Sequence, residues 1–233
     1  MDMLKYYNEK NIIPVHQDIV KSDFGRFRFQ REMLYSNLGI QPSYFTGKNV
    51  AEFGPGTGDN ALVIMQNNPR NITLIDGNVS SLESLKLKIE LGVLDPKVCK
   101  IIDSSVMNYG VGNEFASLYD VVISEGMING NENPDKIVNH LFKMVKPGGV
   151  FILTSVSAWG VVDQAVRRVF LPAINNIASS YFESVQIASG IFRSHLSNLP
   201  TSKPIEDWVQ DAVLHPLTSN YIFDAEDVID CIK

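Results

Sequence analysis

A glycine-rich turn is the first feature of the sequence that could do chemistry. Glu52 is followed by three glycines at alternate positions, Gly54, Gly56 and Gly58. Glycines at this spacing admit positive φ angles and let a ligand approach bare backbone. The spacing differs from G-x-G-x-x-G, because Asp59 stands where the third glycine of a pyrophosphate-binding turn would be. The turn therefore predicts a site for a small molecule, with a dinucleotide as the alternative ligand.

Polar residues also follow three later apolar runs, each at the point where a strand would end. Asp76 closes one run, Asp103 follows the next, and Ser124 and Glu125 follow a third. Parallel strands bring the loops at their carboxyl ends to one edge of a sheet, where ligands bind. We therefore expect these side chains to meet Glu52 in a single crevice. An aspartate at such a position is often only an N-cap or a turn residue, so each one alone has a structural alternative.

Short strand-like runs alternate with helix-like stretches between residues 48 and 154. The runs are rich in β-branched residues, and the stretches repeat apolar residues three and four positions apart. This alternation predicts an α/β fold with a three-layer, doubly wound, mainly parallel sheet. The predicted strands are residues 49–53, 71–75, 98–102, 119–123 and 150–154, and the predicted helices are residues 59–66, 80–91 and 135–145.

The chain divides into four parts around this alternating core. Residues 1–47 predict an N-terminal helical cap, and residues 48–154 form the core itself. Residues 155–220 are too long for a plain connection and predict a mostly helical insertion that acts as a lid. Residues 221–233 predict the start of a C-terminal helix that belongs to the core.

Composition limits the class of protein. With 233 residues, of which 45% are hydrophobic and 20% charged, the chain has the composition of a folded domain. Its net charge of −6 argues against a general nucleic-acid binder, and its two distant cysteines argue against a disulfide framework. No targeting segment, membrane-length apolar run or metal-ligand spacing is visible. We therefore expect a cytoplasmic protein without a metal, a nucleic-acid partner or a membrane partner.

The order of these motifs resembles that of the class I S-adenosylmethionine-dependent methyltransferases. The resemblance covers residues 49–154 and rests on Val50–Gly58, Asp76, Asp103, Asp120 and Leu141–Val150. It implies the Rossmann-like methyltransferase fold, the cofactor S-adenosylmethionine with S-adenosylhomocysteine as product, and no metal. Members of that fold usually add a sixth and a seventh strand, whereas residues 224–232 predict a helix. These two strands are therefore expected to be absent, either because the sheet ends early or because the sequence is truncated.

The resemblance also implies a set of cofactor-binding residues. Asp76 would accept both ribose hydroxyls, and Asp103 would accept from the adenine amine while the Ser104 N–H pairs with a ring nitrogen. Glu52 and the Ser124 carbonyl would hold the cationic ammonium group, and Asp120 is interpreted as structural. The full set is Glu52, Gly54, Gly56, Gly58, Asp76, Gly77, Asp103, Ser104, Ser124 and Glu125.

The methyl acceptor is expected to be a small molecule. Residues 124–128 differ from the Asn/Asp-Pro-Pro-Tyr pattern of nucleic-acid amino methyltransferases. The catalytic residue is unknown, and weak candidates for a base are Glu125, His195, His215 and His16. O-, N- and C-methylation all stay open, and the chain is compatible with a homodimer. The alternative functions are an NAD(P)-dependent oxidoreductase and a non-catalytic cofactor-binding module that acts through a partner.

Aromatic residues in the flanking parts have two interpretations each. In residues 24–31 aromatic and arginine side chains alternate, which suits stacking on a planar or anionic substrate. The favoured alternative is an amphipathic helix with its phenylalanines under the sheet and its arginines in solvent. The aromatics of the insertion either line an acceptor pocket or pack on one another in a separate small core. They are Trp159, Phe170, Tyr181, Phe182, Phe192 and Trp208.

Overall fold

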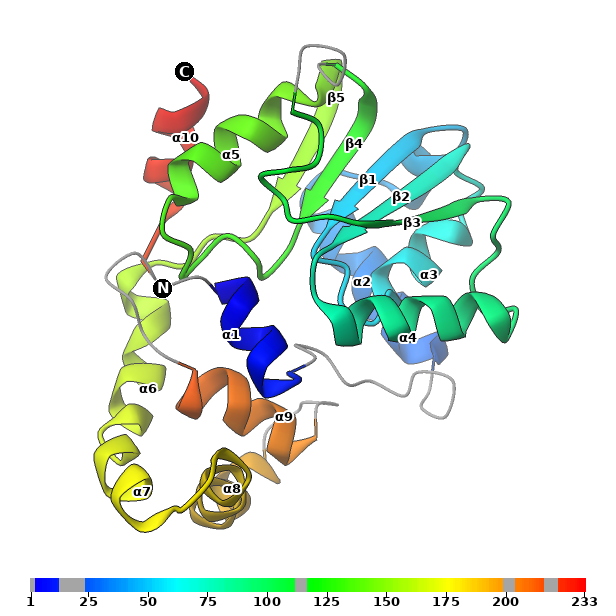
Figure 1. The fold of residues 1–233 in the computed structure, drawn as a ribbon. Coiled ribbons are helices and arrows are strands. Elements are labelled where there is room, and N and C mark those ends of the chain that lie inside the picture. The colour runs from blue at the N-terminus through cyan, green and yellow to red at the C-terminus, as the bar shows by residue number, and fades with distance from the viewer. Residues whose placement is uncertain (1–2, 13–23, 112–116, 199–203, 216–221) are drawn as a thin grey trace.

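The computed structural model describes residues 3–12, 24–111, 117–198, 204–215 and 222–233 (Figure 1). Its centre is a five-stranded parallel sheet in the order β3-β2-β1-β4-β5. The strand order changes direction between β1 and β4, so a crevice is expected at the carboxyl ends of these two strands. The strands are β1 (Asn49–Phe53), β2 (Asn71–Asp76), β3 (Cys99–Asp103), β4 (Tyr119–Ser124) and β5 (Val145–Leu153).

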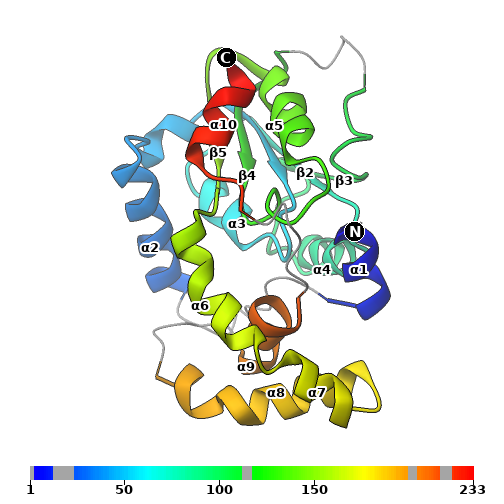
Figure 2. The ribbon, with the colours of Figure 1, turned by 90° about the vertical axis from the view of Figure 1, so that its left-hand side faces the viewer.

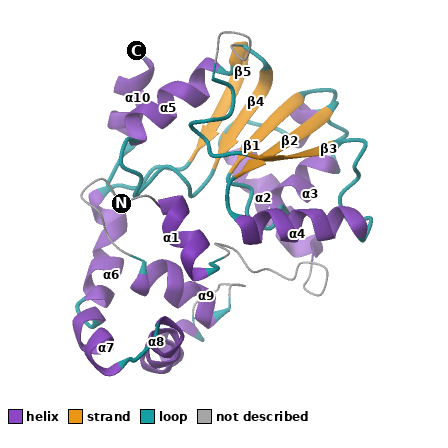
Figure 3. Ribbon diagram, viewed as in Figure 1, coloured by secondary structure: helices purple, strands orange, loops and turns teal. Residues whose placement is uncertain are grey.

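Helices cover both faces of this sheet, which confirms the predicted three layers (Figure 3). Alternate strand residues point to opposite faces. Val50 therefore packs in one buried cluster, with α2 (Phe24–Asn37), α3 (Asp59–Met65) and α4 (Val79–Glu90). Its neighbour Ala51 packs in another, with α5 (Pro134–Lys143) and α10 (Ala225–Ile232).

Two predicted boundaries move by more than one residue in the structure. The helix predicted over residues 135–145 ends at Lys143, and β5 begins at Val145 instead of residue 150. The Lys-Pro-Gly-Gly segment, residues 146–149, is therefore part of the strand, with a register shift between Tyr119 and Val121 of β4. A bulge of this kind accommodates the proline and glycines that regular pairing disfavours.

The insertion after β5 is mostly helical over its described residues and lies beyond the carboxyl ends of the strands (Figure 2). Its elements are α6 (Ala158–Arg168), α7 (Leu171–Ile177), α8 (Tyr181–Leu196), α9 (Ile205–Val209) and the π-helical turn η3 (Gln210–Leu214). Of these elements, α7, α8, α9 and η3 share a hydrophobic cluster that includes Phe192. The longest described helix, α8, has 16 residues, and no helix within the described ranges is long and apolar enough to cross a membrane.

Four of the six aromatics of the insertion follow the second of their two interpretations, and none of the six lines the cavity. Phe192 is buried in the insertion's cluster, and Phe170 packs edge-on against it with the ring centroids 6.0 Å apart. Tyr181 and Trp208 pack on the same cluster, whereas Trp159 and Phe182 are exposed on the surface. The expected aromatic lining of an acceptor pocket is therefore wrong for these residues, because their own small core uses most of them.

Candidate active site at the carboxyl ends of the strands

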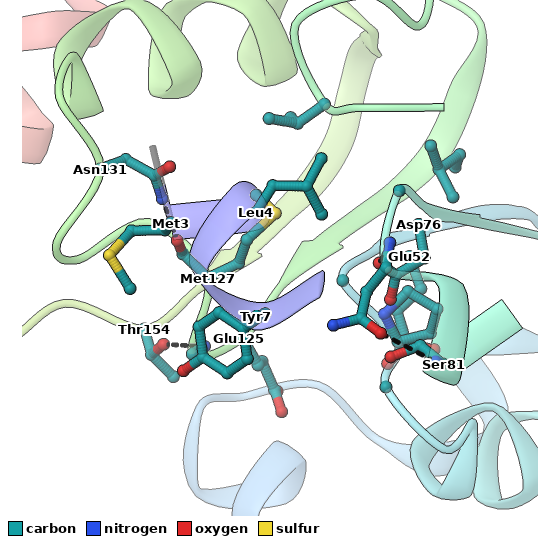
Figure 4. Close-up of a pocket in the computed structure, with 18 of the residues that line it drawn as sticks. Met3, Leu4, Tyr7, Glu52, Asp76, Ser81, Glu125, Met127, Asn131 and Thr154 are labelled. Atoms are coloured by element: carbon teal, nitrogen blue, oxygen red, sulfur yellow. Dashed lines mark hydrogen bonds between the residues drawn. The ribbon is translucent and has the colours of Figure 1, made fainter. Parts of the chain in front are cut away.

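A cavity of about 750 Å³ lies at the carboxyl ends of the strands (Figure 4). Its volume is typical of a site for a small molecule or cofactor. The walls come from the loops after β1, β2, β3 and β4, and from α2, the insertion and the N-terminal helix α1 (Met3–Lys10). Of the predicted cofactor residues, those that line it are Glu52, Gly54, Gly56, Asp76, Gly77, Ser104 and Glu125.

The glycine turn forms part of the cavity wall, and its glycines have different structural roles. Gly54 has a φ of +69°, and a Cβ there would come within 3.3 Å of the Met127 side chain. Gly58 has a φ of +78° as the N-cap of α3, and a Cβ there would lie 2.5 Å from Leu85. Because Gly58 does not line the cavity, its described role is close packing of α3 against α4. The cofactor role predicted for Gly58 stays a prediction.

Glu52 places a buried carboxylate in the cavity wall. Asn60 Nδ2 donates to Glu52 Oε1 at 2.9 Å, whereas Oε2 is buried without a hydrogen-bond partner in the described part of the chain. Burial raises the pKa of Glu52 to about 7, although the Asn60 hydrogen bond acts in the opposite direction. A buried oxygen without a partner is costly, so its position at a cavity points to a ligand that donates a hydrogen bond.

Asp76 is the second buried carboxylate of the wall. Its Oδ1 accepts the backbone N–H of Asn78 at 2.8 Å. Burial raises the pKa of Asp76 to about 6, and backbone N–H groups of Asn78, Gly56 and Gly77 oppose that rise. In the close-up, Asp76, Glu52 and Ser81 lie on one side, and Met127 and Thr154 on the other (Figure 4).

An ion pair between α2 and the loop after β4 was not anticipated from the sequence. Arg31 Nη2 donates to Glu125 Oε2 and also to the Tyr35 hydroxyl, at 3.0 Å, and to Asn60 Oδ1, at 3.2 Å. Only 18% of the Arg31 side chain and 20% of the Glu125 side chain is exposed. Asn60 also binds Glu52, so the network links both predicted acids.

This network corrects the favoured interpretation of residues 24–31. Arg31 lies in the cavity wall instead of solvent, and Phe27 lines the cavity beside it. Phe24 packs against the core, as expected, but Phe29 is exposed. The face of α2 that turns inward is set by its packing on α3, which periodicity within residues 24–31 does not reveal.

Three other predicted residues lie off the cavity. Asp103 is exposed and absent from the lining, whereas the next residues, 104–107, line it. Ser124 is buried, and its carbonyl accepts the Thr154 N–H at 3.2 Å. Their assignments to adenine and to the ammonium group stay predictions. The Asp120 carboxylate accepts a hydrogen bond from the Asn49 N–H and forms an ion pair with Lys146, which confirms its structural interpretation.

The four histidines differ in their position relative to the cavity. His195 is exposed on α8 and does not line the cavity, whereas His215 is buried and does line it. His16 lies outside the described residues. His140 binds the Tyr109 carbonyl at 2.7 Å, as expected of a packing histidine. Within the described ranges, no group of three or more His, Cys, Asp or Glu residues could hold a metal ion.

The N-terminal helix α1 covers the cavity from the front, within the helical cap predicted for residues 1–47, but the sequence did not indicate which of its residues would line the cavity. Met3, Leu4 and Tyr7 line the cavity from α1 (Figure 4). The Asn8 side chain joins α1 to the loop after β2, since it donates to the Gly77 carbonyl at 3.2 Å and accepts the Val79 N–H at 3.0 Å. The helix therefore covers the same strand end that carries Asp76.

Comparisons with known proteins agree with this architecture. The family model described as "Methyltransferase domain" matches residues 29–210. The structure of PKMT2 from Rickettsia typhi in complex with AdoHcy matches with a TM-score of 0.54 and 17% identity, over 79% of this chain and 35% of that one. A structure described as "Conversion of a Disulfide Bond into a Thioacetal Group during Echinomycin Biosynthesis" matches with a TM-score of 0.53 and 16% identity, over 87% of this chain and 65% of that one.

These structural matches show the shared fold alone. The aligned parts of the chain span 43% to 54% of the length of four further matched structures.

Proposed function

Because the chain belongs to the methyltransferase domain family, whose model matches residues 29–210, we propose that it is an S-adenosylmethionine-dependent methyltransferase that acts on a small molecule. The observation that carries the proposal is the Glu52 carboxylate, which lines the cavity with one buried oxygen unpartnered in the described part of the chain. The α-ammonium group of the cofactor is a donor of the kind that this oxygen lacks.

The other wall residues fit the remaining groups of the cofactor. Bound there, S-adenosylmethionine supplies a methyl group that its sulfonium sulfur already activates. Asp76 suits the ribose hydroxyls, because a carboxylate accepts two hydrogen bonds at once. Arg31 suits the cofactor carboxylate, because its Nε is buried without a partner among the described residues. The backbone at Gly54 and Gly56 leaves room beside these groups, since neither residue has a side chain.

Binding measurements test this proposal before any acceptor is known. We expect calorimetry to detect binding of S-adenosylhomocysteine and of S-adenosylmethionine, and to detect no binding of NAD. Asp76→Ala should weaken S-adenosylhomocysteine binding by a factor of roughly 10 to 150, which corresponds to about 1.5–3 kcal/mol for a hydrogen bond to a charged group. Asp230→Ala is the matched control, because Asp230 lies exposed on α10, away from the cavity lining.

Binding of NAD alone would overturn the proposal in favour of an oxidoreductase. Equal affinity of the Asp76→Ala variant and the native protein would show that the ribose is held elsewhere. Turnover of S-adenosylmethionine with an acceptor separates an enzyme from a non-catalytic binding module. A cytoplasmic location, a homodimer and the lack of nucleic-acid or membrane partners stay predictions from the sequence.

A further inference from the structure

The insertion contributes two polar side chains to the lining of the cavity. Asp211 and His215 both line the cavity, and both belong to the π-helical turn η3 or follow it directly. Single π turns are rare and often occur at functional sites. The insertion thus brings a carboxylate and an imidazole into the space that the core residues leave for an acceptor.

Arg168 holds this turn through hydrogen bonds to its backbone carbonyl groups. Its side chain is buried, with Nε donating to the His215 carbonyl at 2.9 Å and Nη2 donating to the Asp211 carbonyl at 3.5 Å. A third donor, Nη1, binds Gln164 Oε1 at 3.2 Å on the same helix, α6. An arginine on the terminal carbonyls of a helix satisfies groups that the helix leaves open. The positions of Asp211 and His215 are therefore set by the insertion itself.

Two tyrosines of α1 complete the surroundings of His215. The rings of Tyr6 and Tyr7 lie 5.9 and 5.7 Å from the imidazole, centroid to centroid. Tyr7 also lines the cavity, and the Tyr6 hydroxyl donates to the Leu214 carbonyl at 3.4 Å. Among the described residues, the charged and titratable groups that these contacts place around His215 are Asp211 on its own turn, Arg168 on α6 and the two tyrosines. An aromatic face next to a carboxylate is a common way to bind an ammonium group.

The charge of the lining points to the same class of ligand. Among the described residues that line the cavity, five carboxylates stand against the single guanidinium of Arg31. Such an excess attracts cations and repels carboxylates and phosphates. Lys88 offsets one acid from outside the lining, through its ion pair with Asp59. The five acids are Glu52, Asp59, Asp76, Glu125 and Asp211.

We propose, on the basis of the function proposed above, that the methyl acceptor is an amine that binds as its ammonium ion between Asp211 and Tyr7. His215 takes one proton from the bound ammonium, which frees the lone pair of the nitrogen. The amine nitrogen then forms a bond to the methyl carbon while the carbon–sulfur bond breaks and sulfur keeps its electron pair. The product leaves as an N-methylammonium ion, and the proton on His215 passes to water.

Three matched probes test the recognition of the amine without relying on turnover. We would titrate 2-phenylethylamine, 2-phenylethanol and phenylacetate into the protein saturated with S-adenosylhomocysteine. The amine should bind at least about tenfold more tightly than the alcohol, and phenylacetate should not bind. Asp211→Asn should remove this preference and leave the affinity for S-adenosylhomocysteine unchanged. Asp163→Asn on α6 is the matched control, because its side chain is 81% exposed and lies outside the cavity lining.

The role of His215 needs a separate readout. His215→Gln should keep the affinities for S-adenosylhomocysteine and 2-phenylethylamine, but it should lower methyl transfer to the amine by about a hundredfold at pH 7. Raising the pH should restore part of the lost rate, since more of the amine is then already neutral. Equal rates for this variant and the native protein would overturn the assignment of His215 as proton acceptor.

The outcomes separate this inference from the function on which it rests. A protein that binds no S-adenosylhomocysteine refutes the proposed function itself. A protein that binds S-adenosylhomocysteine but binds the alcohol as tightly as the amine, or binds none of the three probes, refutes only the amine assignment. Unchanged amine affinity in Asp211→Asn refutes it as well.

Discussion

Replacing Glu52 by glutamine should make the protein more stable at alkaline pH and at the same time weaken its cofactor site. Glutamine keeps the shape of the side chain and can still accept the hydrogen bond from Asn60, but it does not ionise. The carboxylate of Glu52 is buried in the folded protein, so ionising it there is unfavourable.

The magnitude follows from the pKa of this carboxyl. Burial raises the Glu52 pKa from 4.5 to about 7, and at roughly 1.4 kcal/mol per pH unit the difference corresponds to about 3 kcal/mol. A raised carboxyl pKa contributes stability that is fully present below about pH 4.5 and is lost as the pH rises through about 7. The free energy of unfolding of Glu52→Gln should therefore exceed that of the native protein by less than about 1 kcal/mol at pH 5 and by about 3 kcal/mol at pH 8.5.

Urea unfolding followed by far-ultraviolet circular dichroism at the two pH values measures this difference. Asp76 also has a raised pKa, but both proteins carry it, so its contribution cancels. Glu83→Gln, an exposed position on α4, is the control and should show no such pH dependence. Calorimetry should show Glu52→Gln binding S-adenosylhomocysteine at least about tenfold more weakly.

Two results would refute the reasoning. Equal stability of Glu52→Gln and the native protein at pH 8.5 would mean that Glu52 ionises in the folded protein without cost, which contradicts its burial. Unchanged affinity for S-adenosylhomocysteine would mean that the unpartnered oxygen is not where the ammonium group binds.

Three further outcomes are expected. Asp103→Ala tests the predicted contact with adenine: because the residue is exposed outside the cavity lining, we expect S-adenosylhomocysteine affinity to change by no more than about twofold, and a larger loss by calorimetry would support that contact. Arg31→Met should lower the free energy of unfolding by about 1.5–3 kcal/mol, because the partly buried Glu125 loses its ion-pair partner, and adding Glu125→Gln should recover part of this loss in urea unfolding. S-adenosylhomocysteine should slow amide exchange in α1 but not in α10, and equal rates in α1 with and without the ligand would contradict its closure over the site.

The core of the fold could be predicted from local patterns. Runs such as residues 71–76 are apolar and β-branched, and the helices between them repeat apolar residues on one face, so the alternation of strands and helices follows from backbone and burial preferences. The carboxyl ends of parallel strands must share one edge. For this reason Glu52, Asp76 and Glu125 could be placed in one crevice before any coordinates.

Residues far from the glycine turn in sequence could not be assigned in this way. Arg31 and Tyr7 come from helices whose local sequence does not indicate which face turns to the cavity. Asp211 lies in a π-helical turn, and the sequence around it does not predict such a turn. Each enters the site through contacts of long sequence separation, such as Arg31 with Glu125 and Arg168 with the carbonyl of His215.

The sequence alone thus determined the α/β fold, the glycine turn and the acids at the strand ends, because each depends on backbone geometry within a short segment. Tertiary structure decided which side chains close the cavity and which do not. In the folded protein Asp103 lies outside the cavity lining, whereas Arg31 lines the cavity. His215 also lines it, but His195 does not. The physical reason is that the packing of α1, α2 and the insertion on the sheet depends on the shape of the whole core, which no local pattern encodes.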